Sequence, residues 1–336
     1  MERKVVLGGI LVLLMASVAV ATTNRIGTAG AQELRIPIGA RGTGMAGAVI
    51  ADVQGAEALF WNPAGVAWAQ GTEANVSYRG YIADMNLSYF SVLSNFRVGT
   101  IGVSAKILSL GDIYVTTEQD WDGTGEVYSI NIPVLGLTYA RRLTDKVTFG
   151  ATGMYISEQV MQTQAKGIAF DFGFQYVPGW RTLKFGMVMK NYGPRMEFGG
   201  PDFEKPLHDP DDDPQAAVRQ WRLTSADFEL PSSFQVGVTY DFNLGPNGTL
   251  TVGGVFQSND FSEDEYRFGA EFNMNNHIFV RAGYVYCNQE DYLYGATLGV
   301  GTKFNLGRVK AYLDYSHTFV DNYFDDIPEI SLRFAM

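Results

Sequence analysis

From Glu73 to the C-terminus, apolar and polar residues alternate along the chain with a period of two. In one stretch, Phe234, Val236 and Val238 fall on one face, and Gln235 and Thr239 fall on the other. Because successive side chains of a strand point to opposite faces, this alternation predicts strands rather than helices. About fourteen segments carry it, near residues 73–80, 86–94, 98–109, 127–140, 146–158, 166–177, 182–192, 232–242, 248–257, 264–274, 277–286, 292–303, 308–316 and 329–336.

The length and composition of these segments distinguish a membrane barrel from a soluble sandwich. Many segments run to ten residues or more, whereas soluble strands average about 5–6 residues and a tilted membrane-spanning strand needs about 9–11. The apolar faces of the most regular segments carry no charged residue, which a dry sandwich core would also require. The opposite faces are rich in Gly, Ala, Thr, Gln and Asn, which suits a crowded interior better than bulk water. We therefore predict an all-β fold, a transmembrane antiparallel β-barrel.

The joints between the segments support the same fold. Joints after even-numbered segments are short, and those after odd-numbered segments are mostly longer, such as 110–126, 193–231 and 319–328. Short turns on one side and long loops on the other are typical of outer-membrane barrels, with the short turns in the periplasm. An even strand number then places both termini in the periplasm. Aromatic residues near strand ends, among them Tyr284, Tyr286, Tyr292 and Tyr294, predict interfacial girdles.

Residues 1–21 have the features of an export signal. Arg3 and Lys4 precede an apolar run, and Ala19-Val20-Ala21 matches a cleavage site. A second Ala-x-Ala triplet ends at Ala31, so two cleavage positions remain open. An uncleaved anchoring helix is the alternative, because the run is nearly long enough to span a bilayer.

Residues 22–72 precede the first predicted strand and are rich in small and apolar side chains. Barrels of about eight strands are filled by side chains alone, and those of sixteen to eighteen strands leave a channel. Fourteen strands would enclose a lumen that is either open or occupied. We therefore expect residues 22–72 to form a hatch inside the barrel of residues 73–336, with a disordered periplasmic leader as the alternative.

Composition excludes several function classes. The 336-residue chain has a formal net charge of −11, which argues against nucleic-acid binding, and its single cysteine excludes a disulfide scaffold. Gly42, Gly44 and Gly47 match the spacing of a dinucleotide-binding loop, but that motif requires a parallel βαβ unit. Close backbone packing explains these glycines better. No set of residues suggests catalysis, and we expect neither an enzyme nor a bound cofactor.

Two loops and the C-terminus carry further candidate sites. The 193–231 joint contains aromatic residues among acidic ones, which predicts a contact surface for a partner protein, with Phe203, Trp221 and Phe228 as anchors. The same joint holds a weak candidate for Ca²⁺ binding at Asp209, Asp211, Asp212 and Asp213, with a solvated acidic loop as the alternative. Leu332, Phe334 and Met336 alternate to the end of the chain and resemble the signal that the barrel-insertion machinery reads.

The N-terminal region resembles a known family. Gly39-Ala40-Arg41-Gly42, Gly44-Met45-Ala46-Gly47-Ala48 and the tetrapeptide Asn62-Pro63-Ala64-Gly65 look like the signature of the PorV/PorQ family. The resemblance implies a fourteen-stranded FadL-like barrel in the bacterial outer membrane with an N-terminal hatch. From the residues themselves, Asn62 and Pro63 suit a structural role in such a hatch, because Pro fixes φ and Asn bonds nearby backbone groups.

The resemblance also implies functions. Several members serve type IX secretion, which implies an accessory or shuttle protein whose outer loops contact secreted cargo and other secretion components. Related FadL proteins pass hydrophobic small molecules, so passive transport is the alternative, and a purely structural barrel is a third possibility. The expected surroundings are outer-membrane lipid and the barrel-insertion machinery.

Overall fold

The computed structural model describes residues 25–207, 219–245, 248–289, 292–320 and 324–336. The expected signal peptide, residues 1–21, lies outside this part of the chain. Among the described residues, no helix combines the length and the apolar content that a membrane-spanning helix requires.

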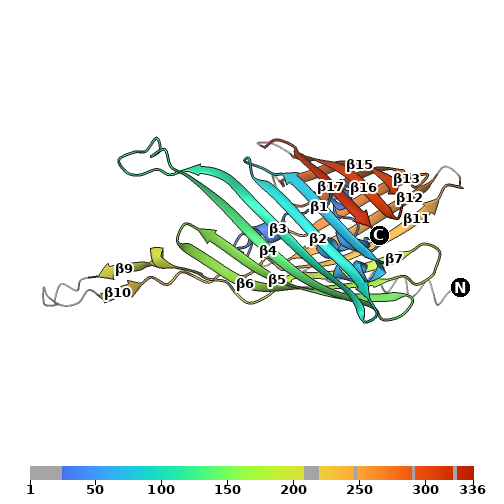
Figure 1. Ribbon diagram of the computed structural model, residues 1–336, viewed down its shortest axis with the longest axis horizontal. Coiled ribbons are helices and arrows are strands. Elements are labelled where there is room, and N and C mark those ends of the chain that lie inside the picture. The colour runs from blue at the N-terminus through green and yellow to red at the C-terminus, as the bar shows by residue number, and fades with distance from the viewer. Residues whose placement is uncertain (1–24, 208–218, 246–247, 290–291, 321–323) are drawn as a thin grey trace.

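Fourteen antiparallel strands form a closed barrel, as predicted (Figure 1). Each strand pairs with its neighbours along the chain, β7 pairs directly with β11, and β1 pairs with β17 to close the ring. The strands are β1 (Thr72–Gly80), β2 (Asn86–Phe96), β3 (Gly99–Tyr114), β4 (Val127–Arg142), β5 (Val147–Val160), β6 (Thr163–Tyr176), β7 (Lys184–Tyr192), β11 (Ser233–Asn243), β12 (Thr249–Asn259), β13 (Glu265–Met274), β14 (Ile278–Cys287), β15 (Tyr294–Leu306), β16 (Val309–Val320) and β17 (Ile327–Ala335).

The barrel has two different rims. The turn rim holds the connections 97–98, 143–146, 177–183, 244–248, 275–277 and 307–308, together with the start of β1 and the end of β17. The loop rim holds 81–85, 115–126, 161–162, 193–232, 260–264, 288–293 and 321–326. The longest connections are on the loop rim, as predicted, but the alternation is not strict. The turn-rim connection 177–183 is longer than 81–85 and 260–264, and β5 and β6 are joined by only two residues because both strands extend further than expected.

The two faces of the sheet confirm the sequence pattern. Phe170 and Phe172 of β6 point outward and are 40% and 41% exposed, whereas Asp171 between them is 3% exposed. The same arrangement recurs on the other strands, where apolar side chains cover the outside and Thr, Gln and charged residues are buried inside. A soluble protein would show the reverse, so the outer surface is suited to hydrocarbon.

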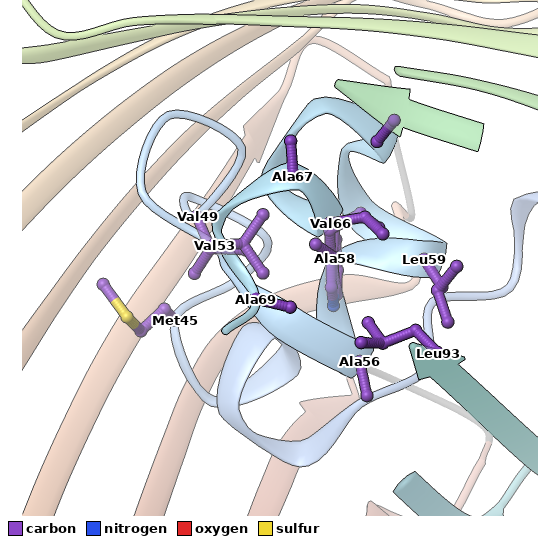
Figure 2. Close-up of a cluster of buried hydrophobic side chains, with 12 residues drawn as sticks. Met45, Val49, Val53, Ala56, Ala58, Leu59, Val66, Ala67, Ala69 and Leu93 are labelled. Atoms are coloured by element: carbon purple, nitrogen blue, oxygen red, sulfur yellow. The ribbon is translucent and has the colours of Figure 1, made fainter. Parts of the chain in front are cut away.

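The N-terminal segment folds inside the lumen, as the hatch prediction requires. It forms η1 (Gln32–Arg35), α2 (Ala40–Gly44), η2 (Gly55–Glu57), α3 (Ala58–Trp61) and η3 (Pro63–Trp68). Figure 2 shows the apolar core of the hatch, in which Met45, Val53 and Val66 are fully buried. Leu93, on β2 of the barrel wall, packs against Leu59 of the hatch. These helices are too short to be stable alone, so their stability comes from packing within the barrel.

The long connection between β7 and β11 has structure of its own. It contains β8 (Phe198–Gly199), η4 (Pro201–Phe203), β9 (Glu204–Leu207) and β10 (Arg219–Arg222). The strands β9 and β10 pair as a two-stranded hairpin that projects beyond the loop rim, at the far left of Figure 1. The sequence pattern predicts only a loop for this whole segment, because β9 and β10 are too short to show a clear alternation.

Candidate functional site

The three glycines of the GxGxxG-like segment lie where the hatch chain packs closely. A Cβ on Gly42 would lie 2.3 Å from the indole nitrogen of Trp61, and Gly47 has a φ of +80°. Gly44 faces the wall, where a Cβ would lie 3.1 Å from the Cα atom of Gly299 on β15. The segment is a close-packed turn inside an antiparallel barrel, which agrees with the packing interpretation of these glycines.

Asn62, Pro63, Ala64 and Gly65 form the contact between the hatch and strands β5 and β6, here called the Asn62 contact. The Asn62 side chain accepts a hydrogen bond from Ala64 N at 3.0 Å and donates one to Ile50 O at 2.6 Å. Pro63 occupies the first turn of η3, where its missing N–H is tolerated. A Cβ on Gly65 would lie 2.1 Å from Val53 O, so close packing rather than a reversal requires glycine there.

The wall is adapted to the Asn62 contact. A Cβ on Gly150 of β5 would lie 2.3 Å from the Pro63 carbonyl carbon, and one on Gly173 of β6 would lie 2.1 Å from the Asn62 amide oxygen. Both glycines point inward at the level of the hatch. The hatch main chain therefore lies directly against the main chain of the wall, and no side chain fits between them.

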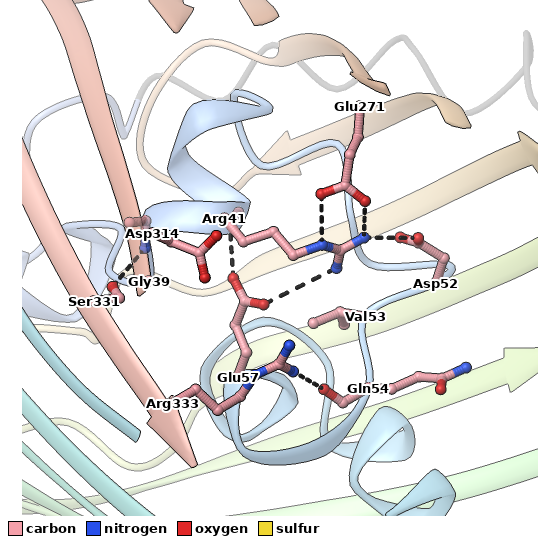
Figure 3. Close-up of polar contacts among 12 residues, drawn as sticks. Gly39, Arg41, Asp52, Val53, Gln54, Glu57, Glu271, Asp314, Ser331 and Arg333 are labelled. Atoms are coloured by element: carbon pink, nitrogen blue, oxygen red, sulfur yellow. Dashed lines mark hydrogen bonds and ion pairs between the residues drawn. The ribbon is translucent and has the colours of Figure 1, made fainter. Parts of the chain in front are cut away.

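On the opposite side, Arg41 joins the hatch to β13 by ion pairs, here called the Arg41 contact (Figure 3). Its guanidinium lies 3.1 Å from a Glu271 carboxylate oxygen and 3.0 Å from one of Asp52, with Glu57 at 4.0 Å. Burial raises the pKa of Asp52 and Glu57, although the positive charge of Arg41 opposes both shifts. Glu271 also pairs with Arg281 of β14 at 2.5 Å, which extends the network along the wall.

The strand that closes the barrel also holds the hatch. Glu329 of β17 accepts hydrogen bonds from Gly39 N at 2.5 Å and from the Thr43 hydroxyl at 2.8 Å. Arg79 of β1 pairs with the same carboxylate at 3.0 Å, and Ser331 accepts a hydrogen bond from Ala40 N. Buried charges and polar groups are thus paired across the junction of β1, β17 and the hatch.

A cavity of about 550 Å³ lies between the hatch and the loop rim. Its lining mixes aromatic and charged groups, including Phe60 and Trp61 of the hatch and Arg79, Lys190 and Arg267 of the wall. Among the described residues of the hatch, three buried polar atoms have no hydrogen-bond partner, and two of them belong to residues that line this cavity, the Trp61 indole nitrogen and one Glu33 carboxylate oxygen. Burial, together with the nearby Glu158, raises the pKa of Glu33 to about 7.

Two tyrosines predicted for the lipid girdle belong to this cavity instead. Tyr292 and Tyr294 line it, and the Tyr294 hydroxyl hydrogen-bonds to that of Tyr81 at 3.0 Å. Tyr284 and Tyr286 do face outward and are about half exposed. The girdle prediction was wrong for Tyr292 and Tyr294, because proximity to a strand end does not determine which face of the sheet a residue occupies.

The three aromatic anchors predicted in the β7–β11 connection do not lie together. Trp221 is on β10 of the projecting hairpin and is 54% exposed. Phe203 ends η4 at the base of that hairpin, where its carbonyl accepts a hydrogen bond from Leu223 N. Phe228 packs against Phe198 and over Gly30 beside the hatch. Of the three, only Trp221 is freely presented on the hairpin.

The comparison with family models finds a similarity in the N-terminal half of the chain. Residues 19–174 match the model described as "Type IX secretion system protein PorV". The matched stretch contains the whole hatch and the strands from β1 to most of β6. The chain is thus similar to the PorV family over a little under half of its length. The resemblance found in the N-terminal signature is thereby confirmed.

Solved structures share the fold of this barrel. The CymD monoaromatic hydrocarbon channel has a TM-score of 0.52 at 13% identity, and the match covers 88% of this chain and 96% of CymD. The toluene transporter TodX of Pseudomonas putida gives 0.51 at 12% identity, covering 85% and 94%. A FadL homologue of Pseudomonas aeruginosa gives 0.50 at 14% identity, covering 89% and 97%. These likenesses establish the FadL-like fold alone, and no curated protein matches the sequence significantly.

The C-terminal residues of the chain complete the wall of the barrel. Leu332 and Phe334 share the outward face of β17, and β17 pairs with both β16 and β1. Met336 is exposed, and its N–H donates to Thr72 O at 3.0 Å. A role of these three residues in barrel insertion stays a prediction.

The metal prediction concerns a segment without a described structure. Asp209, Asp211, Asp212 and Asp213 all lie outside the described residues. In the parts of the chain that are described, no three His, Cys, Asp or Glu residues are grouped as metal ligands.

The residues that anchor the hatch were missed by sequence reasoning. Arg41 lies within the family signature, and Glu271 lies on a polar strand face, but nothing in the sequence pairs them. A charge on the inward face of a predicted barrel strand was the available signal, because such a charge needs a partner in the lumen.

Proposed function

We propose that this PorV-type barrel is an accessory or cargo-shuttle component of type IX protein secretion. The observation that carries the proposal is the family match over residues 19–174, which spans the hatch and most of the first six strands. Its partners would be secreted proteins and other components of the secretion system, contacted through the loop rim.

The geometry of the lumen supports a shuttle over an open channel. The hatch is held by buried ion pairs at the Arg41 contact and by direct backbone packing at the Asn62 contact. Opening a path past it would separate buried charges, which costs about 3–5 kcal/mol for a broken pair. A protein that acts through its outer surface does not need such a path.

We further propose that the loop rim faces the outside of the cell and that the end of β17 lies in the periplasm. The longer connections and the projecting hairpin are on the loop rim, as in other outer-membrane barrels. Arg25, the first described residue, pairs with Glu229 and stacks on Phe261 at the loop rim. The periplasmic assignment is therefore proposed for the C-terminus only.

The β9–β10 hairpin provides the direct test. We would replace residues 204–222 by a short Gly-Ser linker and identify the proteins that copurify from outer membranes of a type IX-secreting host. Residues 228–230 are kept, because Phe228 and Leu230 pack beside the hatch. The matched control shortens the other long connection, residues 116–125.

We expect the hairpin variant to lose copurifying secretion partners while its barrel remains folded and heat-modifiable on gels. The 116–125 variant should retain them. Equal recovery of partners by both variants would contradict a contact through the hairpin. Absence of any secretion partner from the unmodified barrel would contradict the proposed function itself.

FadL-like passive uptake remains the second candidate, and the 550 Å³ cavity favours it. Its aromatic floor at Phe60 and Trp61 could hold an apolar compound. Uptake of a small aromatic hydrocarbon into proteoliposomes that contain the barrel tests this function. Flux equal to that of empty liposomes would reject it, and a failure of both assays would leave a structural barrel.

A further inference from the structure

The turn rim carries a concentration of positive charge although the whole chain is acidic, with a formal net charge of −11. Apart from Arg142, which donates to Ala67 O and stacks on Trp68 of the hatch, six of its basic side chains are exposed in the turns or next to them, and none of the six forms an ion pair within the described part of the chain. They are Arg97, Arg141, Lys146, Arg181, Arg308 and Lys310.

Acidic residues do not offset this charge. The turns, with the three strand residues on either side, contain only three acids in the described chain: Glu73, Asp145 and Asp241. Asp241 pairs with Lys184 at 2.9 Å, and Glu73 accepts the N–H of Ala56. On the loop rim, by contrast, acids outnumber bases more than two to one. The charge of the protein is therefore divided between its two ends.

The basic residues lie where the apolar outer surface ends. Arg97 directly follows Phe96, which is 53% exposed, and Arg181 directly follows Trp180, which is 70% exposed. Arg308 comes two residues after Leu306, which is 62% exposed. Apolar and aromatic residues at this level mark the boundary of the hydrocarbon, so the neighbouring cations lie at the depth of the headgroups.

The cations are also distributed around the circumference. Arg97 is in the β2–β3 turn, and Arg181 is in the β6–β7 turn. Arg141 lies near the end of β4, and Lys146 lies in the β4–β5 turn that follows. Arg308 and Lys310 are at the β15–β16 turn on another part of the ring. A single docked protein would contact one sector, whereas lipid surrounds the whole rim.

We propose that the turn rim is a binding surface for anionic phospholipid headgroups. Arg side chains bond phosphate in a bidentate manner, and each Lys or Arg near an anionic membrane surface contributes about 1 kcal/mol of attraction. The acidic loop rim disfavours the same lipids. Anionic phospholipid therefore gathers at the turn rim, in the periplasmic leaflet under the orientation proposed above.

The test uses the full chain, purified in a non-ionic detergent and incubated with equal amounts of dioleoyl phosphatidylglycerol and dioleoyl phosphatidylcholine. Lipid that stays bound through gel filtration is quantified by mass spectrometry. The turn-rim variant carries Arg97→Gln, Arg141→Gln, Arg181→Gln and Arg308→Gln. The control removes the same charge from the loop-rim side with Lys166→Gln, Lys205→Gln, Arg219→Gln and Arg222→Gln.

We expect the unmodified barrel to retain more phosphatidylglycerol than phosphatidylcholine, and the ratio to fall about fivefold or more in the turn-rim variant, as about 1 kcal/mol of lost attraction predicts. The control variant should keep the original ratio, and 0.5 M NaCl should reduce it in the unmodified barrel. An equal fall in both variants would overturn the proposal. A ratio equal to the input would also overturn it, and would point to an acidic protein as the partner of this rim. Neither the ratio of bound lipids nor its response to salt depends on a role in secretion.

Discussion

The hatch is held in two different ways on the two sides of the lumen. At the Arg41 contact, buried charges from the hatch and from β13 are paired across the interface (Figure 3). At the Asn62 contact, the hatch main chain lies against Gly150 and Gly173, and position is set by steric fit. The Arg41 contact depends on complementary charge, and the Asn62 contact depends on the absence of side chains. Different substitutions should therefore disrupt the two contacts.

The largest effect is expected at the Arg41 contact. Arg41→Met removes the cation and leaves Glu271, Asp52 and Glu57 without their shared partner. Loss of one partner of a buried ion pair costs about 3–5 kcal/mol. Hydrogen exchange across residues 40–61 should show the hatch opening more readily while the strands stay protected.

The matched control for Arg41 is Arg195→Met in the β7–β11 connection. Arg195 also pairs with two carboxylates, those of Asp227 and Glu229, but its side chain is 59% exposed. Exposed pairs contribute about 0–1 kcal/mol, so exchange in the hatch should not change. Similar exchange in both variants would mean that the buried pairs do not hold the hatch.

A smaller loss is expected at the Asn62 contact from Gly150→Ala. The added Cβ would lie 2.3 Å from the Pro63 carbonyl carbon, and overpacking of this kind costs about 1–3 kcal/mol. The matched control is Gly153→Ala on the same strand, where the nearest ring atom is 3.7 Å away. Denaturant unfolding of both variants in detergent should separate them, and equal midpoints would refute the steric account.

Removing the Asn62 side chain should lower the free energy of unfolding by less than Gly150→Ala does. Asn62→Ala loses the cap on Ala64 N and the hydrogen bond to Ile50 O. Such a change typically costs about 1–2 kcal/mol. Protease cleavage within residues 50–65 should become faster, and a rate unchanged from the unmodified barrel would show that backbone packing alone fixes this side.

The smallest effect is a dependence of hatch stability on pH through Glu33. Its pKa is raised from 4.5 to about 7, so the folded hatch binds a proton more tightly than the unfolded chain does. The stability contribution is complete below pH 4.5 and is lost as the pH rises through 7. Glu33→Gln should make the free energy of unfolding less dependent on pH across this window, and an unchanged slope would contradict the assignment to Glu33.

Much of the fold could be predicted because alternation is a local property. Phe170, Asp171 and Phe172 occupy the faces that their spacing requires, and all fourteen barrel strands fall near the expected ranges. The strand ends were less predictable. β3 continues to Tyr114, beyond its expected end at residue 109, because residues 112–114 pair with residues 127–129 of β4 although their own pattern is weak.

The candidate site was predictable only in part. Asn62 and Gly42 were found because their residue types are unusual at those positions, and the structure gives them packing roles. The pairing of Arg41 with Glu271 joins residues 230 positions apart, which no periodic pattern encodes. The separation of Trp221 from Phe228 arose in the same way, because tertiary packing placed one on a projecting hairpin and the other beside the hatch.

The hydrogen bonds that join the hatch to β17 have a consequence for the biogenesis of the barrel. Gly39 and Thr43 are synthesised long before Glu329, which binds both. The ring is sealed where β17 meets β1, next to this carboxylate. Insertion of the hatch and closure of the barrel are therefore coupled. A hatch that folded after closure would find its binding site already enclosed by the barrel.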